Sequence, residues 1–199
     1  MSEGIRTFIA VELPSEVRDT LGSLQQELGD AHGQVRWVAP HNIHLTLKFL
    51  GNIPEERVSP LREGTEEAAA GYAPFGMSLM DLGAFPGPRR ARVIWVGLDQ
   101  GRELLGALAE RLEASLADRG FDRESRRFKP HVTIGRIKGR GRGVDMSEPL
   151  AKVTFDVQTC VVDGLTIMRS DLTPHGPIYT PLHRVLLASE RAEDNNRCE

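Results

Sequence analysis

Two short stretches of the chain place a histidine and a threonine at the same spacing. His44 and Thr46 stand in HLTLKFL, and His131 and Thr133 stand in HVTIGRI. Residues i and i+2 of a strand point to the same face, so each stretch is expected to present its histidine beside its threonine, opposite its apolar residues. If the two strands face each other, two imidazoles and two hydroxyls line one cleft.

Two imidazoles can divide one proton-transfer reaction between them. An unperturbed histidine titrates near pH ~6.5, so one ring can be neutral and take a proton while the other is charged and gives one. Threonine hydroxyls can donate hydrogen bonds to a phosphoryl oxygen as charge develops on it. This set suits cleavage of a phosphoester, above all a strained cyclic one, without a metal or a covalent intermediate. A single histidine on a strand is more often structural, but the repetition of the same pattern favours a catalytic role.

The hydrophobic pattern predicts three helices and nine strands around these motifs. The helices are expected from Pro14 to Gly29, from Pro54 to Gly71, and over 100–119 with a stripe of Leu104, Leu105, Leu108, Leu112 and Leu116. The strands are expected at 5–12, 35–39, 42–51, 75–85, 92–98, 130–137, 152–158, 160–170 and 178–187.

The order of these elements predicts an α+β fold with antiparallel sheets. Strands come in pairs between helices, which differs from the regular alternation of a parallel α/β fold. The elements around His44 are echoed around His131, a little under half the chain later. We therefore expect two similar lobes related by an approximate two-fold axis.

Composition limits the classes of function. The formal charge is −3, so there is no overall cationic field of the kind that drives bulk nucleic-acid binding, and an anionic ligand needs a local cluster. Cys160 and Cys198 are too few for a disulfide framework or a zinc pattern. The N-terminal residues lack a signal-peptide pattern, and no apolar stretch approaches the roughly 20 residues of a membrane span. These observations lead us to expect a cytoplasmic protein without a membrane partner.

The sequence resembles the two-histidine (2H) phosphoesterases, most closely the RNA 2′,3′-cyclic phosphodiesterases, also called 2′-5′ RNA ligases. The resemblance covers nearly the whole chain up to about residue 187. It is carried by RTFIAVELP (6–14), VRWVAPHNIHLTLKFLG (35–51), LGAFPGPRRARVIWVGL (82–98), GFDRESRRFKPHVTIGRIK (120–138) and IMRSDLTPHGPIYTPLHRVLL (167–187).

The resemblance implies a single bilobed domain over 1–187, with one motif per lobe at 44–47 and 131–134. The polar composition of residues 188–199 predicts a disordered tail. It implies hydrolysis of an RNA 2′,3′-cyclic phosphate to a 2′-phosphate, with the reverse 2′-5′ ligation needing no nucleotide cofactor. His44 matches the proton donor to the leaving 3′ oxygen, and His131 matches the base that activates water. Thr46 and Thr133 match the phosphate-binding hydroxyls. Hydrolysis and ligation exchange donor and acceptor by microscopic reversibility.

Four further residues are candidate substrate contacts. Arg136 follows the second motif, although its alternation places it opposite His131 unless the strand twists there. Lys48 has the parity to join His44 and Thr46. Phe85, like Phe8 and Trp37, can offer a stacking surface or belong to the core. Arg127 belongs to a basic cluster that can track an RNA backbone or form a solvated loop, made of Arg126, Arg127, Lys129, Lys138, Arg140 and Arg142.

Two alternatives to an RNA phosphodiesterase stay open on the sequence. One is a binding module that holds a nucleotide or RNA end without turning it over, which would have no need of a matched acid and base. The other is a phosphodiesterase for a small cyclic nucleotide such as ADP-ribose 1″,2″-cyclic phosphate. We expect a monomer that needs no metal or cofactor and acts on RNA ends, tRNA fragments included. An HxxH metal site at His41 and His44 is disfavoured, because that spacing brings ligands together on a helix and not on a strand.

Overall fold

A computed structural model of the chain describes residues 4–29, 33–139 and 143–188. Its helices are α1 (Ser15–Leu28), α2 (Val58–Ala69), α3 (Arg102–Asp118) and α4 (Ser147–Lys152). Its strands are β1 (Ile5–Glu12), β2 (Val35–Trp37), β3 (His44–Ile53), β4 (Phe75–Phe85), β5 (Val93–Leu98), β6 (His131–Ile137), β7 (Gln158–Val162), β8 (Gly164–Thr173) and β9 (Gly176–Leu186). The tail predicted at 188–199 lies, beyond residue 188, outside the described residues.

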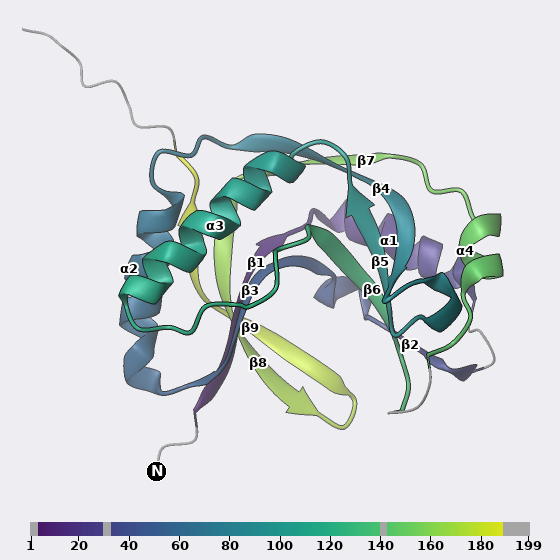
Figure 1. Cartoon of the computed structure of the whole chain (residues 1–199), viewed down its shortest axis with the longest axis horizontal. Coiled ribbons are helices and arrows are strands. Elements are labelled where there is room, and N and C mark those ends of the chain that lie inside the picture. The colour runs from purple at the N-terminus through teal and green to yellow at the C-terminus, as the bar shows by residue number, and fades with distance from the viewer. Residues whose placement is uncertain (1–3, 30–32, 140–142, 189–199) are drawn as a thin grey trace, which may run out of the picture.

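The strands form two lobes that meet at the two motif strands (Figure 1). The His44 lobe contains β9, β8, β1 and β3, and the His131 lobe contains β6, β5, β4 and β7, with β2 paired to β6. All pairings are antiparallel, as predicted, and the lobes are joined through Leu45 of β3 and Val132 of β6. The expected α+β, two-lobed fold is confirmed. The two lobe sheets form one continuous curled sheet.

Each long helix that precedes a motif strand covers the lobe of the other motif. Helix α1 lies between β1 and β3 in the sequence but packs against β6 and β7. Helix α3 lies between β5 and β6 but packs against β3, beside α2 (Figure 1). This exchange gives the two lobes a common apolar core, so neither lobe is closed without the other.

The helix boundaries follow the expected signals. Gly29 ends α1 with φ 68° and Gly120 follows α3 with φ 75°, a left-handed backbone that glycine adopts without strain. Four leucines of the α3 stripe are fully buried, namely Leu105, Leu108, Leu112 and Leu116. Leu104 was wrongly placed in that stripe, because it lies at the edge of the buried face and is 46% exposed.

The sequence between 144 and 173 misled the strand predictions. The strand expected at 152–158 is absent, because 147–152 form the short helix α4 and β7 begins only at Gln158. The strand expected at 160–170 is divided at Asp163 into β7, which pairs with β4, and β8, which pairs with β1. The chain therefore crosses from one lobe to the other at Asp163, where Asp163–Gly164 interrupts the apolar residues with a turn signal that the strand prediction passed over.

Candidate active site

The contact between β3 and β6 brings the two motifs together. Leu45 and Val132 pair directly and are fully buried, so the flanking motif residues lie on the opposite face. Because the strands are antiparallel, His44 lies on the same side of this pair as Thr133, and Thr46 on the same side as His131. All four motif side chains are partly exposed. The shared cleft expected from the sequence is thus compatible with this register.

Both imidazoles are held in the same way by their own chain. Nδ1 of His44 lies 2.8 Å from the carbonyl oxygen of Asn42, and Nδ1 of His131 lies 2.7 Å from that of Lys129. A carbonyl oxygen only accepts, so Nδ1 carries a proton in both rings and donates it. Each neutral ring therefore has its lone pair on Nε2, which is the nitrogen available for proton transfer.

The Thr46 hydroxyl is coupled to the charge of His44. Its Oγ1 lies 2.9 Å from Nε2 of His44. While the ring is neutral, Nε2 can only accept, so the hydroxyl donates to it. Once the ring is protonated, Nε2–H becomes a donor, and the hydroxyl proton is free to turn toward another acceptor. Protonation of His44 thus converts Thr46 into a donor for an anion.

Burial favours the neutral form of both motif histidines. The pKa of His44 lies below its usual value, mainly because of burial, with a further lowering by the Arg136 charge and opposing effects of the Asn42 carbonyl and Glu12. The pKa of His131 is lowered by burial and, more weakly, by Arg136, against the Lys129 carbonyl. A bound phosphodiester anion would favour the protonated form of either ring.

A β-bulge in each motif strand changes which residues share the face of the histidine. In β3, Leu47 is the extra residue between the Thr46–Ala10 and Lys48–Ile9 pairs. In β6, Ile134 is the extra residue between the Thr133–Trp95 and Gly135–Ile94 pairs. A bulge places two successive side chains on one side, so the alternation is shifted beyond it. The residue five positions after each histidine then lies on the face of that histidine.

Those two positions are occupied by Phe49 and Arg136. Phe49 is 61% exposed, and its ring lies 5.9 Å from that of Phe8. Arg136 is exposed, and its charge lowers the pKa of both motif histidines. The parity argument that set Arg136 opposite His131 is therefore wrong, because it assumed an unbroken strand.

The bulge in β3 removes Lys48 from the face of His44, so Lys48 does not join His44 and Thr46 as the alternation predicted. Lys48 is buried, and its Nζ lies 2.7 Å from both carboxylate oxygens of Glu113 and 2.8 Å from the carbonyl oxygen of Asp122. It links β3 to α3 and to the loop after α3. Its role in the structure is the ion pair.

We expect Lys48→Met to lower stability while leaving hydrolysis within about two-fold of wild type. The methionine keeps an apolar stem but leaves the partly buried Glu113 carboxylate without its cation, a loss of about 1–3 kcal/mol in the free energy of unfolding. Urea denaturation and steady-state kinetics measure the two effects. A large loss of activity in a fully folded variant would restore Lys48 as a substrate contact.

Aromatic rings surround both histidines. Phe8 stacks on the His44 ring with centroids 4.8 Å apart, and Tyr179 of β9 meets that ring edge-on at 5.3 Å. Phe85 meets the His131 ring edge-on at 5.1 Å. Phe85 thus lies where a stacking residue was expected. Tyr179 was not anticipated, because β9 lies far from the motifs in sequence and the strand pattern around Tyr179 does not indicate its partner.

The remaining candidates lie at the margins of the site. Arg127 is exposed on the loop that leads into β6. Lys138 donates from Nζ to the carbonyl oxygen of Gly33, at 2.8 Å. Arg140 and Arg142 lie outside the described residues. Within the described ranges, no group of three His, Cys, Asp or Glu side chains could hold a metal ion. None of the helices described is long and apolar enough to cross a membrane.

Comparison with known proteins identifies the family. The family model described as LigT-like phosphoesterase matches twice, at residues 11–95 and 96–179, in agreement with the internal repetition. The chain is 35% identical over 179 residues to an RNA 2′,3′-cyclic phosphodiesterase of Methanothermobacter thermautotrophicus, covering 89% of this chain and 96% of the relative. It is 34% identical to the protein of that name from Thermus thermophilus, covering 96% and 94%.

Solved structures agree with this assignment. TT0787 of Thermus thermophilus superposes with a TM-score of 0.76 at 31% identity, covering 94% of this chain and all of that one. LigT of E. coli in complex with 3′-AMP superposes with a TM-score of 0.74 at 27% identity, with the same coverage. The relatives and the repeated match together show that this chain belongs to the LigT-like phosphoesterase family.

Proposed function

We propose that this protein hydrolyses RNA ends that carry a 2′,3′-cyclic phosphate and leaves a 2′-phosphate. The observation that carries the proposal is the pair of histidines on adjacent strands, each with Nδ1–H held by a backbone carbonyl and Nε2 left for proton transfer. Full-length relatives at 34–35% identity are named for this activity. LigT of E. coli has been solved in complex with 3′-AMP and in complex with phosphate.

In the proposed reaction His131 is the base. Its Nε2 lone pair takes a proton from water as the water oxygen forms a bond to phosphorus. Burial keeps the pKa of His131 low, so the ring is neutral and ready to accept at neutral pH. The Lys129 carbonyl stabilises the imidazolium that results.

His44 is the proposed acid. Its Nε2–H gives a proton to the 3′ oxygen as the bond from phosphorus to that oxygen breaks. Its pKa is low in the free protein, so the substrate anion has to favour its protonation. The protonated ring also releases the hydroxyl of Thr46 to donate to a phosphoryl oxygen. Run in reverse, with an RNA 5′ hydroxyl replacing water, the same steps would form a 2′-5′ bond without a nucleotide cofactor.

Thr46→Val and Thr133→Val should each lower kcat/KM by roughly 5- to 150-fold. Valine keeps the shape of threonine and removes one hydrogen bond to the phosphoryl oxygen, a loss of about 1–3 kcal/mol. Initial rates on a cyclic-phosphate oligonucleotide measure the loss. Thr65→Val, at a buried threonine of α2 that donates to the carbonyl oxygen of Leu61, is the matched control and should retain activity. Two fully active motif variants would exclude both hydroxyls from phosphate binding.

The substrate class is tested by comparing three compounds in excess EDTA. These are an RNA oligonucleotide with a 2′,3′-cyclic phosphate, the same oligonucleotide with a 3′-phosphate, and ADP-ribose 1″,2″-cyclic phosphate. We expect turnover of the first, since two histidines and a phosphate-binding set suffice for the chemistry. Binding of the oligonucleotides without turnover would identify a binding module. Turnover of the ADP-ribose compound alone would identify a small cyclic nucleotide as the substrate.

A further inference from the structure

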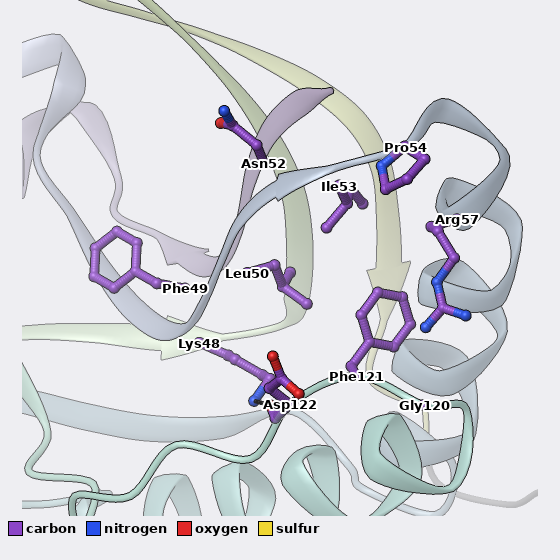
Figure 2. Close-up of a pocket in the computed structure, with 10 residues that line it drawn as sticks. All are labelled: Lys48, Phe49, Leu50, Asn52, Ile53, Pro54, Arg57, Gly120, Phe121 and Asp122. Atoms are coloured by element: carbon purple, nitrogen blue, oxygen red, sulfur yellow. Dashed lines mark hydrogen bonds between the residues drawn. The ribbon is translucent and has the colours of Figure 1, made fainter. Parts of the chain in front are cut away.

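A pocket of about 320 Å³ opens at the end of β3, outside the motif cleft (Figure 2). It lies between β3, the start of α2 and the loop that follows α3. Its volume falls in the range of about 300–1,000 Å³ typical of small-molecule sites. Leu50, Ile53 and Phe121 supply apolar walls, and the side chains of Asn52 and Arg57 bring polar groups to it. The reaction proposed above does not use this pocket.

Phe49 connects the pocket to the site. It lines the pocket, and Figure 2 shows it at the opposite end from Arg57 and Phe121. Its ring also lies 5.9 Å from Phe8, which in turn stacks on His44 at 4.8 Å. A base stacked on the exposed ring of Phe49 would therefore have the cyclic-phosphate site on one side and the pocket on the other.

The loop from Gly120 to Pro130 makes a second connection. It starts at the pocket, which Gly120, Phe121 and Asp122 line, and it ends at His131. Four exposed cations lie along it: Arg123, Arg126, Arg127 and Lys129. Of its two acidic residues, Glu124 is engaged by the backbone N–H of Arg126, and Asp122 lies at the pocket. The loop thus offers net positive charge along the path between the two sites.

Arg57 supplies a cation inside the pocket. Its guanidinium lies 4.2 Å from the centre of the Phe121 ring and donates to the carbonyl oxygen of Arg119 at 2.8 Å. No ion pair joins it to a carboxylate of the described residues, whereas Lys48, the other cation of the pocket, is neutralised by Glu113. A guanidinium with free N–H groups suits a phosphate, and the exposed amide of Asn52 can both donate to and accept from a base edge.

We propose that this pocket binds a nucleotide two or three positions before the terminal one in an RNA substrate. Its base would lie on the apolar wall beside Asn52, with its phosphate toward Arg57 and the loop cations. This inference rests on the proposed function and adds that the protein recognises a polynucleotide end and not only the cyclic nucleotide. Binding in the pocket would then determine which substrates are preferred and would leave the chemical step unchanged.

The test compares uridine 2′,3′-cyclic phosphate with the 5′-phosphorylated tetranucleotide pApApApU that ends in a 2′,3′-cyclic phosphate. For the wild-type protein we expect a kcat/KM about 10-fold higher for the tetranucleotide, the size of one charge-assisted hydrogen bond. Arg57→Gln should remove most of this preference while leaving mononucleotide hydrolysis within about two-fold. Asn52→Ala should reduce the preference in the same way. The matched control is Arg62→Gln, on α2 and paired with Glu66 on the surface, which should change neither rate.

The two substrates separate failure of this inference from failure of the proposed function. A wild-type protein that hydrolyses neither compound overturns both. Hydrolysis of both compounds at the same kcat/KM overturns the pocket and leaves the proposed function in place. If Arg57→Gln lowers kcat/KM by the same factor for both compounds, Arg57 acts through the fold. That result too would overturn the proposal that the pocket binds a nucleotide.

Discussion

His44→Ala and His131→Ala are each expected to lower kcat by about 100- to 10,000-fold, the usual contribution of a general acid or base. Each variant keeps the strand and the cleft but loses the one Nε2 that takes or gives the proton. The losses should not add in the double variant, because removing one half of a concerted transfer already disables the other. Kinetics on a cyclic-phosphate oligonucleotide, with thermal unfolding as a check of structure, measure the effect.

The matched control for these variants is His175→Ala. His175 is exposed in the turn between β8 and β9, and its replacement should leave kcat unchanged. Folding of the His131 variant should be close to wild type, since that ring contacts only Phe85 and the Lys129 carbonyl in the contacts described. The His44 variant should be less stable, because Phe8 and Tyr179 lose a packing partner. Full activity of either variant would contradict the two-histidine mechanism.

Arg136→Met should lower kcat/KM by roughly 10- to 150-fold and move the whole pH profile to higher pH. The loss of rate corresponds to about 1.5–3 kcal/mol for a hydrogen bond from a cation to the substrate phosphate. The shift in pH follows from the field of the guanidinium, which lowers the pKa of both histidines. Without this charge both pKa values rise, so the base stays protonated and the acid keeps its proton up to higher pH.

Two further variants separate the contact from the charge. Arg136→Lys keeps the positive charge and should leave the pH profile near that of wild type while losing the guanidinium geometry and part of the rate. Arg184→Met removes a surface arginine that pairs with Asp163, and it should change neither the rate nor the pH profile. An Arg136→Met variant with wild-type kcat/KM and an unmoved profile would make Arg136 an ordinary surface residue.

Much of the fold could be predicted because local patterns and tertiary structure agree. The strand over 75–85 has the bounds expected from its apolar residues, and both long helices that precede the motif strands end at glycines. The repeat of His44–Thr46 at His131–Thr133 predicted two comparable lobes before any contact was known. Burial of Leu45 and Val132 at the centre of the sheet explains why alternation gave the right face for these four residues.

The residues around the motifs could not be predicted, because a β-bulge has no clear sequence signature here. Each bulge follows its threonine directly, at Leu47 and at Ile134, and shifts the alternation for the residues that come next. The bulge in β3 turns Lys48 into the core, toward Glu113. The bulge in β6 turns Arg136 toward the histidines. Strict alternation assigns both side chains to the wrong face for this one reason.

The tertiary exchange between lobes was also beyond sequence reasoning. The crossing of α1 to the His131 lobe depends on which surfaces fit and does not change the local apolar pattern. Asp163–Gly164 marks a turn in the sequence, but it does not show that the strands on either side of it enter different lobes. Tyr179 reaches His44 only because β9 is brought beside β8, so its position follows from long-range pairing.

The most direct test of the central claim is the position of the phosphate in the product. An RNA oligonucleotide ending in a 2′,3′-cyclic phosphate is incubated with the protein in excess EDTA, and the product is assigned by phosphorus NMR. The acid is fixed on one strand and the base on the other, so the acid can protonate only one of the two ring oxygens. The account therefore predicts the 2′-phosphate alone. A mixture of 2′- and 3′-phosphates, or an oligonucleotide that binds and stays cyclic, would contradict it.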